Sequence, residues 1–179
     1  LFLGSVSNAV LAESKRPLLL LRDEVPATGD RLRVGIAVDG SAYGEAATDY
    51  VLAHKDFFGA DPDFRVLHVV RDYQALVATT SVEYVMPTVS TEEFEKSTAE
   101  EFEKTVKPVL ERFEKADVPV QAEKLRGFAS DAIAQYAKNE LDLLVIGSHG
   151  YGNFKSAVLG STAMHIAAEC KVPLLVVRR

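Results

Sequence analysis

Leu141-Asp-Leu-Leu-Val-Ile146, followed by Gly147-Ser-His-Gly-Tyr-Gly-Asn153, is the stretch of sequence that decides the fold. Its first six residues are almost wholly apolar, which is typical of a strand buried on both faces. The glycines that follow allow a sharp turn and leave main-chain N–H groups unshielded by a Cβ. A helix predicted over Ser156–Glu169 then leads into a last apolar strand over Pro173–Val177. This order of elements indicates an α/β fold built on parallel strands.

The preceding residues, from Leu32 onward, continue the same alternation of buried strands and amphipathic helices. Further strands are predicted over Leu32–Asp39, Phe64–Val70 and Val118–Leu125, and further helices over Tyr43–Phe57, Thr91–Ala116 and Ser130–Asn139. Ser130 is predicted to be the N-cap of its helix, and Pro108 is expected to kink or end the long helix that contains it. Arg71–Ser90 is expected to be a loop or a short irregular helix. Right-handed crossovers then predict a doubly wound, five-stranded parallel sheet of the Rossmann-like type, with ligands bound beyond the carboxyl ends of its strands.

Length and composition exclude several classes of protein. The chain has 179 residues, of which 20 are Lys or Arg and 26 are Asp or Glu, giving a net charge of −6. This acidic balance argues against a nucleic-acid partner. No apolar run is long enough to cross a bilayer, so we expect no membrane partner and a cytoplasmic location. A single cysteine, Cys170, excludes a disulfide framework and a cysteine-based zinc site, and we expect it to be a small packing residue.

An internal repeat accounts for the N-terminus. Leu3–Arg22 aligns without gaps with Leu159–Arg178 and is identical to it at 10 of 20 positions. We therefore expect residues 1–22 to be the last helix and strand of a preceding copy of the domain, residues 23–31 to be a linker, and residues 32–179 to be a complete copy. The chain starts with Leu1 rather than Met, as expected of a piece of a longer polypeptide or of a processed one.

The two copies of the repeat each end in an apolar strand, at Leu18–Arg22 and Leu174–Arg178. An apolar edge strand invites pairing with another strand. We expect the first of these strands to dock on the second, or on a second molecule.

The glycine-rich loop has the chemistry of a phosphate site. Gly147 and Gly150 are followed, after nine residues, by Gly160-Ser161-Thr162. Bare main-chain N–H groups and the start of a helix both favour an anion, and the two hydroxyls are potential donors. The spacing is not that of a Walker A loop. The alternative for Gly150 and Gly152 is a tight strand-to-helix turn with no ligand.

This spacing resembles the nucleotide-binding signature of the universal stress protein family, G-2x-G-9x-G-(S/T), and the resemblance covers Leu32–Arg179. It implies an adenine-nucleotide alpha hydrolase-like fold and an adenine-nucleotide ligand, ATP, ADP or AMP, with Mg²⁺ held mainly by phosphate oxygens and water. It also implies that family members pair through their last strand, as a homodimer or as a pseudo-dimer within one chain. The residues it assigns to the ligand are Ala37, Val38, Asp39 and Val69 beside the adenosine, Gly127 near the ribose, and Gly147, Ser148, His149, Gly150, Gly160, Ser161 and Thr162 around ribose and phosphates.

Several of these side chains have alternative explanations. Asp39 could cap the helix that follows it, and His149 could be a solvated loop residue. His68 alternates with apolar neighbours on a strand and is expected to be a core residue, whereas His54 and His165 lie on predicted helices and are expected to be structural. No pair of histidines has the spacing of a metal site, so no metal ligand is predicted.

No nucleophile–base–orienter arrangement marks an enzyme, and no catalytic residue is predicted. Only Lys155, His149 and Arg126 are candidates to act near a terminal phosphate, so we expect nucleotide binding with slow hydrolysis at most. The leading hypothesis is a nucleotide-binding regulatory protein of the stress response. The alternatives are a weak ATPase or self-phosphorylating enzyme using Ser161, and an interaction module that binds no nucleotide.

Overall fold

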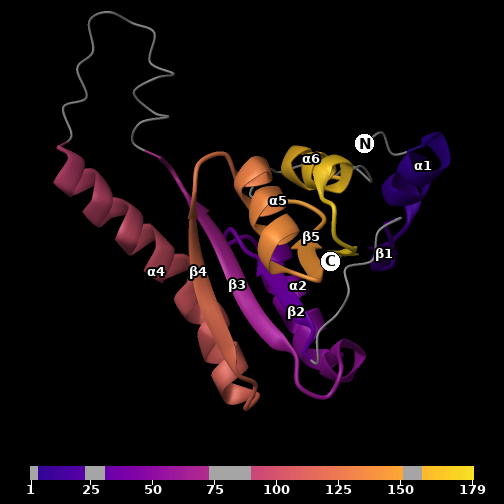
Figure 1. Cartoon of the computed structure of the whole chain (residues 1–179), viewed down its shortest axis with the longest axis horizontal. Coiled ribbons are helices and arrows are strands. Elements are labelled where there is room, and N and C mark those ends of the chain that lie inside the picture. Colours follow the sequence, from indigo (N-terminus) through magenta and orange to yellow (C-terminus); the bar gives the residue numbers. More distant parts are fainter. Residues whose placement is uncertain (1–3, 23–30, 73–89, 151–158) are drawn as a thin grey trace, which may run out of the picture.

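The computed structural model describes residues 4–22, 31–72, 90–150 and 159–179. Its strands form one sheet in the order β1-β6-β5-β2-β3-β4. The strands are β1 (Leu18–Leu20), β2 (Arg33–Ala37), β3 (Asp63–Val70), β4 (Val120–Arg126), β5 (Leu143–Gly147) and β6 (Leu174–Val177). β2 to β6 are parallel, as predicted, but β1 joins the edge antiparallel, so the sheet has six strands instead of five. Figure 1 shows β4 and β1 at opposite ends of this sheet.

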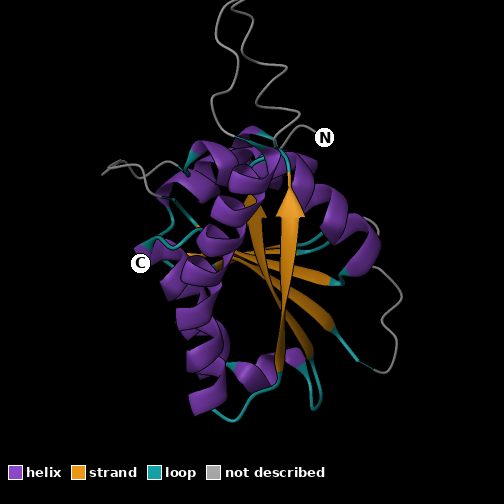
Figure 2. Cartoon of the chain, turned by 90° about the vertical axis from the view of Figure 1, so that its left-hand side faces the viewer, coloured by secondary structure: helices purple, strands orange, loops and turns teal. Residues whose placement is uncertain are grey.

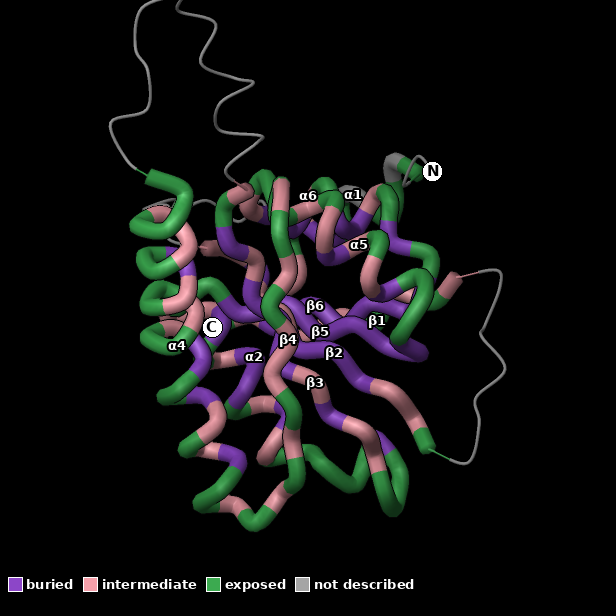
Figure 3. Tube along the Cα trace, turned by 60° about the vertical axis from the view of Figure 1, so that its left-hand side comes forward, coloured by how far each residue is buried: buried purple, intermediate pink, exposed green. Residues whose placement is uncertain are grey.

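Helices cover both faces of the sheet, which makes the fold doubly wound (Figure 2). On one face, α5 (Ala129–Glu140) and α6 (Ser161–Glu169) bury apolar side chains against β3, β5 and β6, and α1 (Ser5–Glu13) adds Leu11 to the same cluster. On the other face, α2 (Ala42–Ala53) and α4 (Thr91–Lys115) do the same. The central strands are therefore buried almost throughout (Figure 3), which explains their unbroken apolar sequences.

Three local predictions differ from the structure. Of the two outcomes expected at Pro108, a kink or an end, the end does not occur: α4 runs on to Lys115, because its apolar face stays packed on the sheet through Val106, Val109 and Phe113. The N-cap of α5 is Phe128 and not Ser130, whose hydroxyl donates to the side chain of Asp131. The helix predicted to reach Phe57 ends at Ala53 and continues as a 3₁₀ turn, η1 (Lys55–Phe58). Arg71–Ser90 lies largely outside the described residues.

β1 docks on β6, the first of the two pairings expected for it. In this pairing Leu19 faces Leu175, which is its equivalent in the repeat. The contacts on either side of this pair are reciprocal: Arg22 donates to the carbonyl oxygen of Ala167 at 2.6 Å, and its equivalent Arg178 donates to the carbonyl oxygen of Leu11. Because Leu11 and Ala167 are also equivalent, the terminal segments meet about a local two-fold axis.

An ion pair between a buried carboxylate and a partly exposed arginine fixes the start of β2 against the start of β5. Asp142 is 3% exposed and accepts hydrogen bonds from the backbone N–H of Arg33 at 2.8 Å and from its guanidinium at 2.9 and 3.1 Å. Burial alone would raise the pKa of Asp142, but these hydrogen bonds outweigh it and hold the pKa below its usual value. The pair lies at the amino ends of the strands, opposite the edge at which ligands of such sheets bind.

Within the described ranges, no helix is both long and apolar enough to cross a membrane.

Candidate functional site

A cavity of about 280 Å³ lies at the carboxyl ends of β2, β3 and β5, beside the first turns of α5 and α6. Ten of the twelve residues that the sequence assigns to a ligand border this cavity. They are Ala37, Val38, Asp39, Val69, Gly147, His149, Gly150, Gly160, Ser161 and Thr162. Segments more than 100 residues apart in the sequence are thus brought together at one edge of the sheet.

Gly127 and Ser148 are not among the described residues that line the cavity. Gly127 has a φ of +116°, and its N–H donates to the carbonyl oxygen of Val70. The turn between β4 and α5 therefore explains why a glycine stands here, because its positive φ disfavours other residues. Ser148 is buried behind the loop, where its backbone N–H donates to Val177 and its carbonyl oxygen accepts from Gly160. Ser148 therefore supports the loop from behind.

Two glycines of the loop lie at points of close approach, to the backbone at Gly147 and to a side chain at Gly150. A Cβ on Gly147 would lie 2.6 Å from the carbonyl oxygen of Tyr43, so glycine allows α2 to pack against the end of β5. A Cβ on Gly150 would lie 2.6 Å from Oδ2 of Asp39, which brings the loop against the end of β2. Asp39 is held in place because its Oδ1 accepts from the N–H of Ser41 at 2.9 Å. Ser41, not Asp39, is the N-cap of α2.

The start of α6 differs from the prediction in a way that changes the site. Leu159 and Gly160 are not helical, and the helix begins at Ser161, so the prediction of a helix from Ser156 is wrong in this part. Gly160 is the N-cap, and no side chain of the described residues caps the first turn. Ser161 and Thr162 therefore lie in the first turn, where N–H groups have no partner within the helix. This uncapped turn lies at the edge of the cavity and favours an anion.

Two histidines border the cavity. Nδ1 of His149 lies 3.0 Å from the hydroxyl of Ser148, and its Nε2 is buried without a hydrogen-bond partner in the described part of the chain. His68 is buried, as expected of a core residue, but it also reaches the cavity. Its Nδ1 donates to the carbonyl oxygen of Val38 at 2.9 Å. Since a carbonyl can only accept, the neutral ring carries its lone pair on Nε2, which has no described donor.

The remaining wall of the cavity is small and apolar, and it was not predicted. It consists of Gly44, Ala129, Ile133, Ile146, Ala163 and Ile166. Their spacing along the helices and strands is that of ordinary core residues. Only the three-dimensional structure therefore shows that they line the cavity. Asp39 is the single carboxylate among the described lining residues, and none of these is Lys or Arg.

The candidate catalytic cations do not assemble here. Arg126 is paired with Glu95 through two hydrogen bonds of 2.6 and 2.9 Å and is not among the described residues at the cavity. Lys155 lies outside the described residues. Cys170 is buried, and burial raises the pKa of its thiol, consistent with a packing residue rather than a nucleophile.

Known proteins share both the sequence and the fold. The sequence profile of the universal stress protein family matches residues 31–178. A universal stress protein of Mycolicibacterium smegmatis is 29% identical over 185 residues, covering 98% of this chain and 56% of that protein. The chain thus spans about half the length of this relative.

Solved structures agree on the fold. A universal stress protein from Archaeoglobus fulgidus has a TM-score of 0.64 at 23% identity and covers 100% of this chain with 57% of its own. An Arabidopsis thaliana member of the family, solved with AMP bound, has a TM-score of 0.54 at 19% identity, with 83% of this chain and 92% of that chain covered. At these identities the likeness establishes the fold alone. Together with the family profile over residues 31–178, it shows that the chain belongs to the universal stress protein family.

Proposed function

We propose that this chain is a nucleotide-binding regulatory protein of the stress response, which holds an adenine nucleotide in the cavity beside Asp39 and Gly150. The observation that carries the proposal is that the uncapped first turn of α6 and the Gly147–Gly150 loop border the same cavity. Main-chain N–H groups at a helix start are suited to phosphate oxygens. The AMP-bound family member from Arabidopsis supports this type of ligand.

The chemistry of the lining suggests how the nucleotide lies. Phosphates fit beside Ser161 and Thr162, because their hydroxyls and the N–H groups of the first turn of α6 are donors; the N–H of Gly160 is already bonded to Ser148. Adenosine fits the apolar wall near Ile133 and Ile146. The Asp39 carboxylate can accept hydrogen bonds from its hydroxyl or amino groups, whereas a phosphate offers it no donor. With one carboxylate in the described lining, Mg²⁺ would be bound mainly by phosphate oxygens and water.

Calorimetry tests the proposal directly. Titration of the chain with ATP, ADP and AMP, each with and without Mg²⁺, is expected to give saturable binding of one equivalent for at least one of them. Absence of binding to all three would overturn the proposal and favour an interaction module. We propose binding without efficient turnover, because the described lining holds no Lys or Arg to stabilise a transferring phosphate. We also propose that the protein acts in the cytoplasm.

His149→Ala is expected to weaken nucleotide binding about tenfold, the effect of losing one hydrogen bond to a charged group. His149 borders the cavity, and its buried Nε2 has no hydrogen-bond partner among the described residues, so we propose a phosphate oxygen as that partner. Calorimetry measures the loss. The control is His54→Ala, since His54 is the C-cap of α2, its ring contacts the carbonyl oxygen of Tyr50, and it is not among the described residues that line the cavity. Equal affinities for all three proteins would contradict this role.

We also propose that α1 and β1 are the end of a preceding copy of the domain, joined to this one as a pseudo-dimer. Val10 of α1 and Leu21, which follows β1, are exposed where their equivalents are buried: Val10 is 49% exposed against 2% for Ile166, and Leu21 is 69% exposed against 2% for Val177. α1 and α6 also have equivalent bounds. An exposed apolar face of this kind is covered in a finished domain. Since β1 already pairs with the free edge of β6, we propose the pseudo-dimer within one chain and not the homodimer.

Hydrogen exchange tests this arrangement. In a longer natural polypeptide that includes the residues before Leu1, the N–H groups of β1 are expected to exchange at least about tenfold more slowly than in the 179-residue chain, because a neighbouring strand would pair with its open edge. Those of β6, paired in both, serve as the control. Unchanged exchange of β1 would contradict the proposal.

A further inference from the structure

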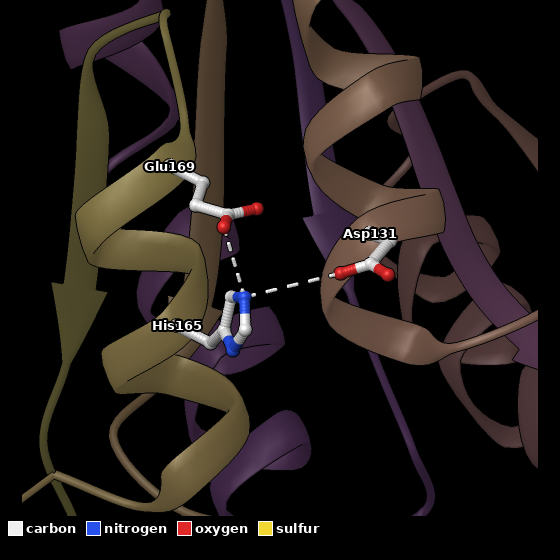
Figure 4. Close-up of side chains that lie close together, drawn as sticks. All are labelled: Asp131, His165 and Glu169. Atoms are coloured by element: carbon white, nitrogen blue, oxygen red, sulfur yellow. Dashed lines mark ion pairs between the residues drawn. The ribbon is translucent and has the colours of Figure 1, made fainter. Parts of the chain in front are cut away.

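A second group of polar side chains lies on the outside of the α5–α6 pair, separate from the residues that line the cavity. Nε2 of His165 lies 3.0 Å from Oε1 of Glu169 and 4.0 Å from Oδ1 of Asp131. One donor atom from each side chain lies within 4.8 Å of the others. Figure 4 shows that His165 and Glu169 project from α6 toward Asp131, which projects from α5.

The three side chains form a donor set suited to a divalent transition metal. Two carboxylates and one imidazole supply two oxygens and one nitrogen. This combination suits Zn²⁺ better than Mg²⁺ or Ca²⁺, because those two ions prefer oxygen ligands alone. With metal–ligand bonds of about 2.0–2.2 Å, tetrahedral ligand atoms lie about 3.3 Å apart. The present separations of 3.0 and 4.0 Å approach that value and require only side-chain adjustment.

Few basic side chains compete with a metal ion for the two carboxylates of the cluster. His165 is the only basic side chain paired with either Asp131 or Glu169 in the described parts of the chain. Two carboxylates thus meet a single imidazole, so acidic side chains outnumber basic ones in the cluster. Glu169 is also the last residue of α6, where the helix dipole disfavours a negative charge. A bound cation relieves both effects.

Exposure and anchoring allow a metal to enter and be held. The side chains of Asp131, His165 and Glu169 are 62%, 52% and 52% exposed, so water can complete the coordination. Glu169 lies one turn after His165 on the same helix, which fixes their separation. Asp131 is oriented by the hydroxyl of Ser130, which donates to its Oδ1 at 3.1 Å.

From this arrangement we infer that Asp131, His165 and Glu169 form a Zn²⁺ site that bridges α5 and α6. A single His and a Glu on one helix offer two ligands, whereas Asp131 adds a third from the neighbouring helix. The metal therefore links two helices whose first turns form part of the cavity wall, through Ala129 and Ser161. The inference does not depend on nucleotide binding, because none of the three ligands lines the cavity.

Calorimetric titration of the metal-stripped, tag-free chain with ZnCl₂ tests the site. We expect saturable binding of one equivalent, and none with MgCl₂ under the same conditions. His165→Ala is expected to lose binding, and Asp131→Asn to weaken it at least about tenfold. Zn²⁺ is also expected to raise the Tm of the wild type but not that of Asp131→Asn, because only a three-ligand site joins the two helices.

His54→Ala is the matched control, because His54 is also an exposed histidine, at the C-cap of α2, and this variant should bind Zn²⁺ like the wild type. Failure of Zn²⁺ to bind, or binding that survives His165→Ala, would overturn the site. Full affinity in Asp131→Asn would overturn the bridge between helices. Circular dichroism of each variant excludes unfolding as the cause of a loss, and nucleotide titration of the same variants reports separately on the cavity.

Discussion

Gly150→Val is expected to weaken nucleotide binding at least about 100-fold, equivalent to about 2.7 kcal/mol. A Cβ at this position would lie 2.6 Å from Oδ2 of Asp39, which is itself held by the N–H of Ser41. Valine must therefore displace the carboxylate, the loop or both, and its methyl groups would fill space at the cavity. Calorimetry with the nucleotide that the wild type binds measures the loss.

Gly4→Val is the control for introducing a β-branched residue. Gly4 is the N-cap of α1 and equivalent to Gly160 in the repeat, but it is exposed, and a Cβ there would meet nothing within 4 Å. We expect this variant to bind like the wild type. The result for Gly150→Val is interpretable if its Tm stays within a few degrees of the wild type. Retained affinity in a folded Gly150→Val protein would show that the loop does not approach the ligand.

Asp142→Asn is expected to lower the free energy of unfolding at neutral pH by about 3 kcal/mol. The substitution replaces a buried acceptor of three hydrogen bonds by an amide whose NH₂ group faces the donors of Arg33. Urea denaturation measures the change. Asp61→Asn is the control: its ion pair with Arg31 is exposed, so the expected effect is below about 1 kcal/mol.

The same substitution has a defined pH dependence. The pKa of Asp142 is lower in the folded chain than in the unfolded chain, so its ionised form stabilises the fold. This contribution is complete at neutral pH and is lost as the pH falls through the lowered pKa. The wild type and Asp142→Asn should therefore differ at pH 7 and converge in acid. A difference that does not depend on pH would mean that packing, not charge, holds Asp142 in place.

The succession of elements along the chain and the parallel type of β2 to β6 could be predicted because the central strands of a parallel sheet are buried on both faces and leave a continuous apolar signal in the sequence. The helix boundaries were less predictable. Pro108 does not end α4, because packing on the sheet holds together a helix that local rules would break. The start of α6 at Ser161 follows from Gly160 being the N-cap, a role that glycine also fulfils at Gly4 in the repeat.

The site was predictable where glycine spacing and strand ends marked it, and not elsewhere. Ile133 and Ile166 line the cavity, but their spacing is that of any buried helix face. His68 is both a buried strand residue and a cavity residue, two roles that a single sequence cannot separate. Asp131 and His165 are 34 residues apart and meet only because α5 packs beside α6, so pairwise spacing along the chain gave no sign of them.

The antiparallel contact between β1 and β6 has a kinetic consequence, because both strands belong to one polypeptide. Their association is first-order, and the linking residues set an effective local concentration that dilution does not reduce. A symmetric interface between separate molecules would dissociate as the protein became scarce in the cell. This one instead persists at any expression level, and only local unfolding or proteolysis between the strands can separate it.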